Sequence, residues 1–402
     1  MIPVAEAIDI VLAQTSALPV ESVAISESSG RILAEDIVAD TDLPPFDRAQ
    51  MDGYAVRAAD VANTPARLKI VGESAAGAGW HHEMKAGEAV RIMTGAPVPV
   101  GADAVQQVEL TREANDAGQV EILQSVEVGR SIVRRADEIK AGAVVLRAGE
   151  DLNAQTIAML ASFGYATVKL GRRPRVAIMA TGSELVDVDQ KPARDQIRDS
   201  NNHVIEAYAK LAGATVERLP LAGDDRDGLK KEMTAAIERC DVLITSGGVS
   251  MGMYDFTKAA FKDLGAEIFF ERVALRPGKP TVFGRIGKTL LFGLPGNPVS
   301  VAVTFNLFAR TALRAMQGAN EPMLKHEQAV LARELKGSAD RESYLPAILR
   351  TDEKGTLLAE PLKWGGSSDF VSFARATALI NVPANAKTIA AGSTVRIVQL
   401  PR

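Results

Sequence analysis

Residues 242–252 read Val242-Leu243-Ile244-Thr245-Ser246-Gly247-Gly248-Val249-Ser250-Met251-Gly252. The first four are leucine or β-branched residues, which predict a short buried strand. The serine and glycine residues that follow predict a tight turn at the carboxyl end of that strand. A strand of this kind is typical of a sheet that is covered by helices on both faces.

The same pattern continues outward from this segment in both directions. Further buried strands are predicted at 176–179, 215–221, 267–270 and 290–294, and helical spacing occurs at 202–211, 227–239, 256–264 and 298–316. Strands that alternate with helices indicate βαβ units. We therefore expect a central α/β domain at residues 173–320, built on a parallel or mixed sheet.

The flanking regions are predicted to be richer in β-structure. An N-terminal region, 1–172, begins with a helix at about 4–17 and a strand–turn–strand at 20–40 that bends at Gly30. Between it and a second helix at 153–163, which ends at Gly164, short strands at 68–71, 89–93, 104–108 and 120–123 predict an inserted β subdomain at about 44–143. After the central domain, strands at 328–334, 344–349, 356–360, 378–382 and 394–399 predict a small β-barrel or sandwich at 325–402.

The composition excludes several classes of protein. The chain has 402 residues and a formal net charge of −4, so no overall positive charge favours nucleic acid. Cys240 is the single cysteine, which excludes an internal disulfide and a cysteine-rich metal site. No apolar run is long enough for a membrane span, and Met1-Ile2-Pro3-Val4 carries no basic stretch of a secretory signal. We expect a cytoplasmic protein.

Glycine- or serine-bearing turns follow four of the predicted strands of the central domain. They contain Thr181-Gly182, Ser246-Gly247-Gly248 with Ser250, Pro295-Gly296-Asn297-Pro298-Val299-Ser300, and Gly223-Asp224-Asp225. Ligands bind beyond the carboxyl ends of such strands, where backbone N–H groups and helix N-termini attract anions. Any one of these turns can be merely structural, but four at one sheet edge favour a nucleotide or anion site. None is a P-loop or a dinucleotide-binding glycine motif.

Charged residues lie in or near the same turns. Glu184, Asp224 and Asp255 are carboxylates that could share Mg²⁺ with a phosphate, although helix N-capping is the alternative for such residues. Arg272, Arg276 and Lys279 are cations around two prolines and a glycine, which suits an oxyanion, with a solvated basic turn as the alternative. None of the four histidines has a spacing that predicts a zinc site or a catalytic triad.

Six segments of the chain together resemble the MoeA family and its gephyrin-type relatives. The first reads Leu43-Pro44-Pro45-Phe46-Asp47-Arg48-Ala49-Gln50-Met51-Asp52-Gly53-Tyr54-Ala55, and it is followed in order by 91–99, 180–185, 246–252 with Asp255, 276–280 and 294–300. The order and approximate spacing of the segments hold from the N-terminus to the C-terminal domain.

The resemblance implies a function and an assembly. Members of the family insert molybdate into adenylylated molybdopterin and release AMP, with Mg²⁺, and they are homodimers whose active cleft is shared between subunits. By motif, Asp52 and Thr94 would reach across the dimer interface, while Glu184, Asp224 and Asp255 would surround the phosphoanhydride and the magnesium. Asp52 would belong to the catalytic set with those three carboxylates.

The resemblance also implies which residues bind the substrates. Arg272, Arg276 and Lys279 would hold molybdate and phosphate, and Arg341 with Ser367 would close over the oxyanion. The turns would line the cleft through Thr181, Gly182, Ser246, Gly247, Gly248, Ser250, Pro295, Gly296, Asn297, Pro298 and Ser300. Where the family shows Arg-x-x-Gly-x-Asp, this chain reads Arg134-Arg135-Ala136-Asp137-Glu138, so the acidic position falls on Glu138, with Asp137 as the alternative.

Two other functions fit parts of the sequence. A molybdopterin adenylyltransferase shares the α/β domain and its loops, but it has neither the inserted subdomain with Asp52 nor the C-terminal β domain. Such an enzyme is also a candidate partner, because it makes the adenylylated substrate. A non-enzymatic scaffold, as among gephyrin relatives, is the other alternative.

Overall fold

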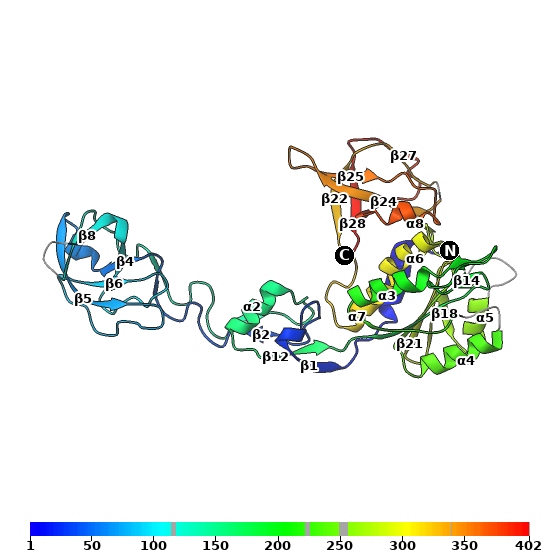
Figure 1. Cartoon of the computed structure of the whole chain (residues 1–402), viewed down its shortest axis with the longest axis horizontal. Helices are drawn as coiled ribbons and strands as arrows, with labels where there is room; N and C mark the ends of the chain where they lie inside the picture. Colours follow the sequence, from blue (N-terminus) through cyan, green and yellow to red (C-terminus); the bar gives the residue numbers. More distant parts are fainter. Residues whose placement is uncertain (114–117, 222–225, 249–255, 339, 402) are drawn as a thin grey trace. The chain divides into compact units, whose positions relative to one another are not determined.

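A computed structural model describes residues 1–113, 118–221, 226–248, 256–338 and 340–401 (Figure 1). The described chain forms two compact units, and each is considered by itself. The larger unit comprises Met1–Glu35, Ala148–Ile157 and Thr167–Arg402, and the smaller unit comprises Asp36–Arg147 and Ala158–Ala166.

A six-stranded mixed sheet forms the centre of the larger unit. Its strand order is β16 (Thr215–Arg218), β13 (Arg175–Ala180), β17 (Val242–Ser246), β21 (Thr289–Leu294), β20 (Val282–Ile286) and β18 (Glu267–Phe270). The first four strands are parallel, and β20 and β18 are antiparallel to their neighbours. The α/β fold predicted from the alternation of strands and helices is confirmed, with a mixed sheet.

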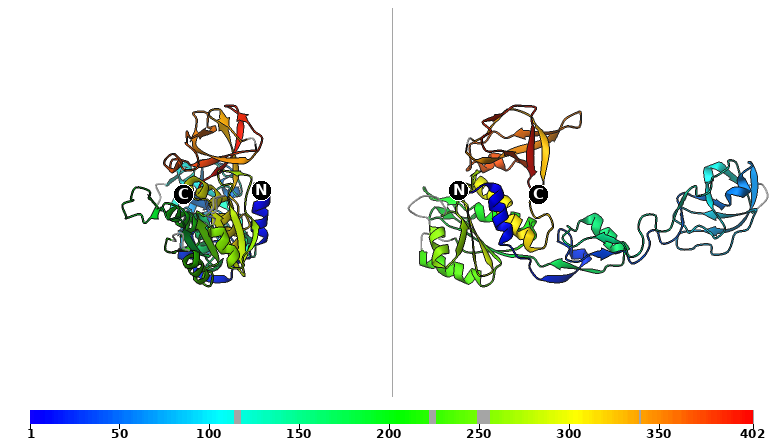
Figure 2. Two further views of the ribbon diagram at one scale, coloured as in Figure 1. Left: turned by 90° about the vertical axis from the view of Figure 1, so that its right-hand side faces the viewer. Right: turned by 180° about the vertical axis from the view of Figure 1, so that it is seen from behind.

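Helices cover both faces of this sheet (Figures 1 and 2). One face packs against α1 (Val4–Ala13), α3 (Asn201–Leu211), α6 (Pro298–Thr304) and α7 (Arg310–Met316), and the other against α4 (Arg226–Ile237) and α5 (Phe256–Asp263). In β17, Val242 and Ile244 face the first core and Leu243 faces the second. Because both faces are buried, the strands contain continuous apolar runs.

The C-terminal part of the larger unit is a closed barrel. Five strands form it: β22 (His326–Leu331), β24 (Glu342–Thr351), β25 (Leu357–Pro361), β26 (Ala378–Val382) and β28 (Thr394–Gln399). The long strand β24 pairs with β25 along one edge and with β26 along the other, which closes the ring. Of the two architectures predicted for this region, the barrel is therefore the correct one. A short strand, β19 (Leu275–Arg276), joins β24 from the α/β part of the chain.

The smaller unit is built around a second six-stranded sheet. The order is β7 (Ala104–Gln107), β4 (Gly53–Val56), β6 (Glu88–Ile92), β5 (Ala66–Ser74), β9 (Gln119–Ile122) and β8 (Thr111–Glu113). Both faces are buried, since Tyr54 and Val56 of β4 pack into one core and Ala55 into another. The sequence did not predict β4, which starts at a glycine. That glycine is needed, because a Cβ at position 53 would overlap the carbonyl oxygen of Gln106.

Several predicted elements differ from the structure. The segment 20–40 does not form a hairpin: β1 (Val20–Ala24) pairs with β12 (Thr167–Gly171), and β2 (Ile37–Val38) pairs with β11 (Val144–Leu146). Helix α1 ends at Ala13 rather than near residue 17, and Leu18 donates its backbone N–H to the carbonyl oxygen of Met316. Gly164, after α2 (Ala154–Ser162), has a φ of +76°, as a residue that ends a helix requires.

The predicted strand list also omitted β20, and the last predicted helix of the central domain is interrupted. Gly284 weakens the strand signal of β20, yet a side chain there would press against the carbonyl oxygen of Glu267 at 2.6 Å. A π-helical turn, Phe305–Ala309, separates α6 from α7. The remaining short strands and α-helix of the described chain are β3 (Arg48–Ala49), β10 (Ile132–Val133), β14 (Leu185–Val186), β15 (Ile197–Arg198), β23 (Leu335–Lys336), β27 (Thr388–Ile389) and α8 (Phe370–Phe373). The described residues also include three 3-10 helices, at Ile25–Glu27, Ala58–Val61 and Val108–Leu110.

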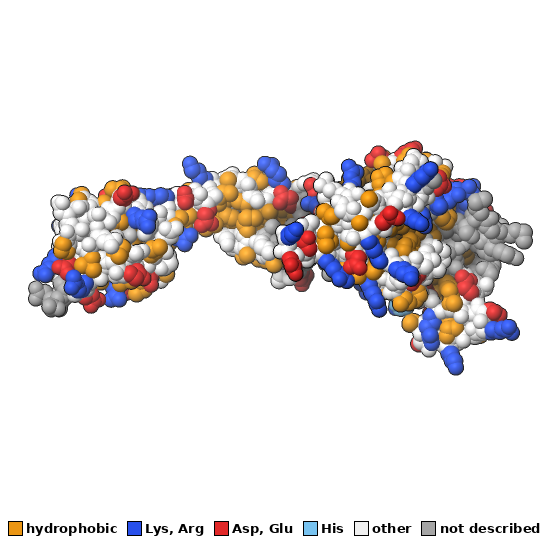
Figure 3. All heavy atoms as spheres, turned by 90° about the horizontal axis from the view of Figure 1, so that it is seen from above, with side chains coloured by type: hydrophobic (Ala, Val, Ile, Leu, Met, Phe, Trp, Pro, Cys, Tyr) orange, Lys and Arg blue, Asp and Glu red, His pale blue; other side chains and the backbone are white. Residues whose placement is uncertain are grey.

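Most charged side chains of the described residues are exposed or partly exposed, and the buried exceptions are Arg31, Asp199 and Arg314. On the face shown in Figure 3, lysine and arginine are interspersed with aspartate and glutamate. Among the described residues, no helix combines the length and apolarity needed to cross a bilayer.

Candidate active site

Three parallel strands end side by side at the carboxyl edge of the central sheet. Ala180 of β13 is in register with Ser246 of β17, which is in register with Leu294 of β21. The next residues continue this contact, because Thr181 donates its N–H to the oxygen of Ser246 at 2.9 Å and Gly247 donates to that of Leu294 at 3.1 Å. Three of the four turns predicted at this edge therefore begin beside one another, and the fourth, 223–225, lies outside the described residues.

Glycine is required at two positions of the turn that follows β17. Gly247 has a φ of +87°, and a Cβ there would lie 2.5 Å from the carbonyl oxygen of Thr181. Gly248 has a φ of +63°, and its Cβ would lie 2.6 Å from the Oγ1 of Thr257. A side chain at either position would be strained and would push the neighbouring backbone away. The Ser-Gly-Gly sequence thus allows the turns to approach closely.

These turns line a cavity of about 1630 Å³ that also contacts the C-terminal barrel. We call it the edge cavity. The predicted binding residues that line it are Thr181, Gly182, Glu184, Ser246, Gly247, Gly248, Arg276, Lys279, Pro295, Gly296, Asn297, Pro298, Ser300, Arg341 and Ser367. The structure thus brings together residues from six separate segments of the sequence.

Two cations of the edge cavity lie at the end of β19 and on the turn that follows it. Arg276 belongs to the strand that pairs with the barrel, and the backbone oxygen of Lys279 accepts a hydrogen bond from Val273 at 3.0 Å. Both side chains are exposed, and neither has a carboxylate within ion-pair distance in the described parts of the chain. Fixed and unpaired cations are suited to an anionic guest.

A third cation comes from the barrel. Arg341 lines the edge cavity, and its Nε lies 3.5 Å from the carboxylate of Asp340, at the loose end of hydrogen-bond geometry. Arg272, in contrast, is exposed but is not among the lining residues, and its carbonyl oxygen accepts a hydrogen bond from Ile2. Its predicted role in oxyanion binding remains a prediction.

The carboxylates of the edge cavity include one that the sequence did not predict. Glu184 is exposed at the cavity, and Asp199, only 6% exposed, accepts a hydrogen bond from the backbone N–H of Asn202 at 3.1 Å. Among the described residues, no three histidine, cysteine, aspartate or glutamate side chains are grouped so that they could hold a metal ion. Asp224, Asp255 and Ser250 lie outside the described residues.

Buried polar atoms without partners occur at the lining of the edge cavity. The Nδ2 of Asn201 donates to the oxygen of Gly296 at 2.8 Å, but its Oδ1 is buried and has no partner in the described structure. Ser246 is only 1% exposed, and its Oγ is also buried with no hydrogen-bond partner in the described structure. Such atoms are costly unless something else satisfies them. The run Asp199-Ser200-Asn201-Asn202, which opens α3, was the sequence signal that would have revealed this part of the site.

The turn after β21 is attached to the barrel through Ser367. The Nδ2 of Asn297 donates to the Oγ of Ser367 at 2.8 Å, and the N–H of Val299 donates to its carbonyl oxygen at 3.1 Å. Both residues of the pair, Asn297 and Ser367, line the edge cavity. One wall of the cavity is therefore fixed by contacts between the α/β part and the barrel.

The remaining predicted residues belong to the smaller unit. The Oδ1 of Asp52 accepts hydrogen bonds from the N–H of Thr94 at 2.6 Å and from its hydroxyl at 2.8 Å. These two bonds lower the pKa of Asp52, because they stabilise its ionised carboxylate. Glu138 forms an exposed ion pair with Arg48 at 3.3 Å.

Comparisons with known proteins agree along the whole chain. Residues 2–164 match the MoeA N-terminal region (domain I and II), residues 177–315 a probable molybdopterin binding domain, and residues 328–400 the MoeA C-terminal region (domain IV). The molybdopterin molybdenumtransferase of Bacillus subtilis (strain 168) is 37% identical, covering 98% of this chain and 93% of that protein. That of Staphylococcus aureus (strain COL) is 36% identical, covering 99% and 95%.

A solved structure gives the same result. The molybdopterin biosynthesis MoeA protein from Pyrococcus horikoshii OT3 has a TM-score of 0.84 and 29% identity, covering 99% of this chain and all of that one. The matches extend over all three regions of the sequence, and they agree with the fold described above. This chain belongs to the MoeA family.

Proposed function

We propose that this protein inserts molybdate into adenylylated molybdopterin and releases AMP, giving Mo-molybdopterin. The observation that carries the proposal is the edge cavity, in which glycine-bearing turns and unpaired cations meet at the carboxyl end of a parallel sheet. The names of the relatives from Bacillus subtilis and Staphylococcus aureus support the same reaction.

The size of the edge cavity suits a large composite substrate. Its volume of about 1630 Å³ exceeds the roughly 300–1000 Å³ of pockets that hold one drug-sized ligand. A pterin joined to a nucleotide, together with a separate oxyanion, needs such a space. A single small metabolite would leave much of it filled with water.

The cations of the edge cavity reduce the repulsion between the two anionic substrates. Molybdate is a dianion, and its Coulomb repulsion with an anionic pterin phosphate is on the order of several kcal/mol in a partly dry cleft. Arg276, Lys279 and Arg341 all line the edge cavity and offset this repulsion. We infer that they hold molybdate and phosphate close enough for the two pterin sulfurs to bind molybdenum, while one oxo group leaves with the two thiol protons as water. The reaction requires no protein nucleophile.

Mg²⁺ is a further part of the proposal, and the donor set fits it. One or two carboxylates with substrate phosphate oxygens are enough for this ion. Glu184 and Asp199 line the edge cavity, and motif matching adds Asp224 and Asp255. When bound, the ion would neutralise charge on the leaving AMP.

We also propose a homodimer whose subunits complete each other's sites. The support is the match of Asp52 and Thr94 to the family's N-terminal motifs, and the paired geometry that keeps the Asp52 carboxylate ionised. Mixing Asp52→Ala and Lys279→Ala proteins tests this idea, because a heterodimer would contain one intact site. The mixture is assayed at a molybdate concentration too low for Lys279→Ala alone to be active. Recovery of activity after subunit exchange is expected, and a mixture no more active than its two components would contradict the shared site.

The proposed function suggests where the protein works and which enzyme supplies its substrate. We propose that the protein works in the cytoplasm, where its one cysteine, the buried Cys240, stays reduced. We also propose that a molybdopterin adenylyltransferase supplies its substrate, since the adenylylated pterin must be made first. Transfer without loss into bulk solvent would favour a direct contact between the two enzymes.

One assay separates this function from its rivals. Purified protein is incubated with adenylylated molybdopterin and Mg²⁺, with and without molybdate, and AMP is measured. The proposal predicts AMP release that depends on molybdate, together with molybdenum bound to the pterin. Net formation of adenylylated pterin from molybdopterin and ATP would favour an adenylyltransferase, and no reaction of either kind would favour a scaffold.

A further inference from the structure

The first turn of α6 is capped in an unusual way. Asn297 is the N-cap residue of this helix, a position where an asparagine side chain usually accepts a hydrogen bond from the second or third backbone N–H. Here the side chain makes no such bond. The N–H of Val299, the second residue of the helix, donates instead to the carbonyl oxygen of Ser367. The C-terminal region thus supplies the cap through the Ser367 carbonyl oxygen, and the Asn297 side chain can form a different hydrogen bond.

The Asn297 side chain contacts the hydroxyl of Ser367 instead. Asn297 donates from Nδ2 to the Oγ of Ser367 at 2.8 Å. A hydroxyl has one proton and two lone pairs, so a serine that accepts from asparagine keeps its own proton for a different acceptor. Among the described residues, no acceptor lies within hydrogen-bond distance of that proton. Ser367 lines the edge cavity, so a guest in the cavity is the available acceptor.

The serine is held on its other side as well. Asp369, two residues further on, accepts hydrogen bonds from the N–H of Gly365 at 2.8 Å and from that of Ser372 at 3.1 Å. The segment 365–369 is therefore fixed by the barrel at one end and by the turn after β21 at the other. A donor that is fixed in this way loses little entropy when it meets an anion.

We propose that Asn297 is a positioning residue that turns the Ser367 hydroxyl into a hydrogen-bond donor for the oxyanion in the edge cavity. The proposal rests on the proposed function, because molybdate is the oxyanion in question. Asn297 acts through Ser367 and need not touch the substrate. Its contribution is the direction of one hydrogen bond: an amide N–H that donates to the serine leaves the serine free to donate onward.

The direction of that hydrogen bond gives a sharp test. In Asn297→Asp the new carboxylate can only accept, so it would accept a hydrogen bond from the Ser367 hydroxyl. It would also add a negative charge beside the oxyanion. If the Asn297 amide instead accepted from the serine in the native protein, aspartate would preserve the contact. The added charge weakens oxyanion binding in either orientation, so the orientations differ in whether Asn297→Asp has a further effect that disappears when Ser367 is already alanine, which the double variant Asn297→Asp/Ser367→Ala tests.

The experiment measures molybdate binding to the purified full-length protein by titration calorimetry, for wild type, Asn297→Asp, Asn297→Ala, Ser367→Ala and the double variants Asn297→Ala/Ser367→Ala and Asn297→Asp/Ser367→Ala. We expect Asn297→Asp and Ser367→Ala each to weaken binding about tenfold or more. We expect Asn297→Ala to weaken binding in the wild type but to have no further effect when Ser367 is already alanine. In turnover, the molybdate KM should rise much more than kcat falls.

A structural role would give a different pattern, which the controls detect. Asn320→Ala is the matched control, because this exposed asparagine also donates one hydrogen bond from Nδ2, to Ala148, away from the edge cavity. It should leave molybdate binding unchanged, and thermal midpoints should show that all variants are folded. Additive effects of the two alanine substitutions, or unchanged binding by Asn297→Asp, would overturn the positioning role alone. A wild-type protein that binds no molybdate would overturn both this inference and the proposed function.

Discussion

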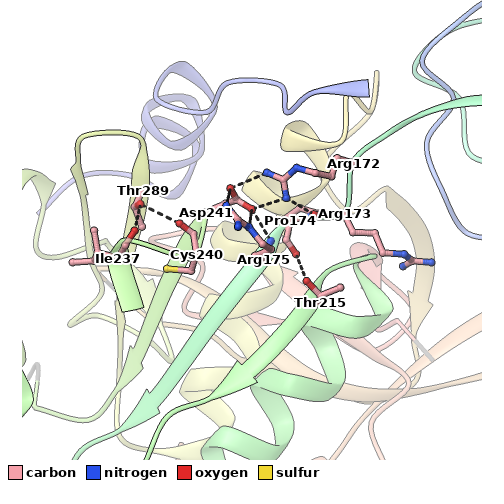
Figure 4. A network of polar contacts seen from close by, with 9 residues as sticks. All are labelled: Arg172, Arg173, Pro174, Arg175, Thr215, Ile237, Cys240, Asp241 and Thr289. Carbon is pink, nitrogen blue, oxygen red and sulfur yellow. Dashed lines mark hydrogen bonds and ion pairs between the residues drawn. The ribbon is translucent and has the colours of Figure 1, made fainter. Parts of the chain in front are cut away.

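The carboxylate of Asp241 accepts one hydrogen bond from each Nη atom of Arg172, at 3.0 and 2.9 Å (Figure 4). The same carboxylate accepts the backbone N–H of Arg175 at 2.7 Å. Asp241 immediately precedes β17, so this network lies at the amino end of the strand whose carboxyl end borders the edge cavity. The contact joins the segment that enters the central sheet to its middle strand, and it thereby holds β13 and β17 in the register on which the site depends.

Replacing Asp241 by asparagine should destabilise the larger unit. Burial favours the neutral acid, but hydrogen bonds from Arg172 and Arg175 outweigh this effect and lower the pKa of Asp241. Loss of the charged acceptor should reduce the free energy of unfolding by about 2–3 kcal/mol at neutral pH. A thermal unfolding scan of Asp241→Asn beside wild type measures this change.

The same residue predicts a dependence on pH. Because the pKa of Asp241 is lower in the folded protein than in the unfolded chain, its stabilisation is present above the unfolded pKa of about 3.9 and is lost as the pH falls through the folded pKa. The midpoint difference between wild type and Asp241→Asn should therefore shrink below about pH 4. Glu217→Gln, which removes an exposed pair with Arg239, serves as the control and should change the midpoint little. Equal midpoints for wild type and Asp241→Asn at pH 7 would show that the network does not support the sheet.

A methyl group at Gly247 should disturb the turn after β17. The residue has a φ of +87°, which costs alanine about 1–2 kcal/mol, and its Cβ would also crowd the oxygen of Thr181. Gly318→Ala is the matched control, since its φ is +86° and nothing lies within 4 Å of the added carbon. We expect Gly247→Ala to lower both the thermal midpoint and AMP release more than Gly318→Ala does. Equal effects would mean that close approach of the turns is unimportant.

Lys279→Ala should raise the molybdate concentration that half-saturates AMP release. The ammonium group is exposed at the edge cavity, and losing one charge-assisted hydrogen bond weakens binding by about ten- to one-hundredfold. Steady-state rates over a range of molybdate concentrations measure this change. Lys288→Ala, an exposed lysine directly before β21 and hence at the opposite edge of the sheet, should have no effect. An unchanged molybdate requirement in Lys279→Ala would count against its oxyanion role.

Asp255→Asn should leave the protein folded and reduce AMP release sharply. The prediction comes from the family motif, in which this carboxylate lies by the phosphoanhydride and Mg²⁺. Single-turnover release of AMP at saturating Mg²⁺ gives the measurement, and Asp187→Asn, at an exposed position, is the control. Wild-type rates in Asp255→Asn would remove this residue from the active site.

Much of the α/β domain was predictable from sequence, because its strands are buried on both faces. Continuous apolar runs such as 242–245 are typical of strands in a covered sheet, and the turns after them are marked by glycine. Two of the strands that were missed, β4 and β20, contain glycine for a different reason. Gly53 and Gly284 lie where another backbone approaches too closely for a side chain, so the residue that makes each strand fit also weakens its signal.

The cavity residues were predictable in part for a similar reason. Turns at the ends of parallel strands must share one edge, so Thr181, Ser246 and Pro295 could be placed together from the order of strands and turns in the sequence. The contribution of Asp199 and Asn201 was missed, because a run that opens a helix also reads as an ordinary N-cap. The contact between Asn297 and Ser367 joins residues 70 positions apart, and no local pattern in the sequence reports it.

The most direct test of the central claim is a crystal structure of the protein with AMP, Mg²⁺ and molybdate. We expect both anions in the edge cavity. Molybdate should lie beside Lys279 and Ser367, and the nucleotide phosphate should lie against the turns after β13 and β17. Anions that bind elsewhere, with the edge cavity holding only water, would contradict the claim.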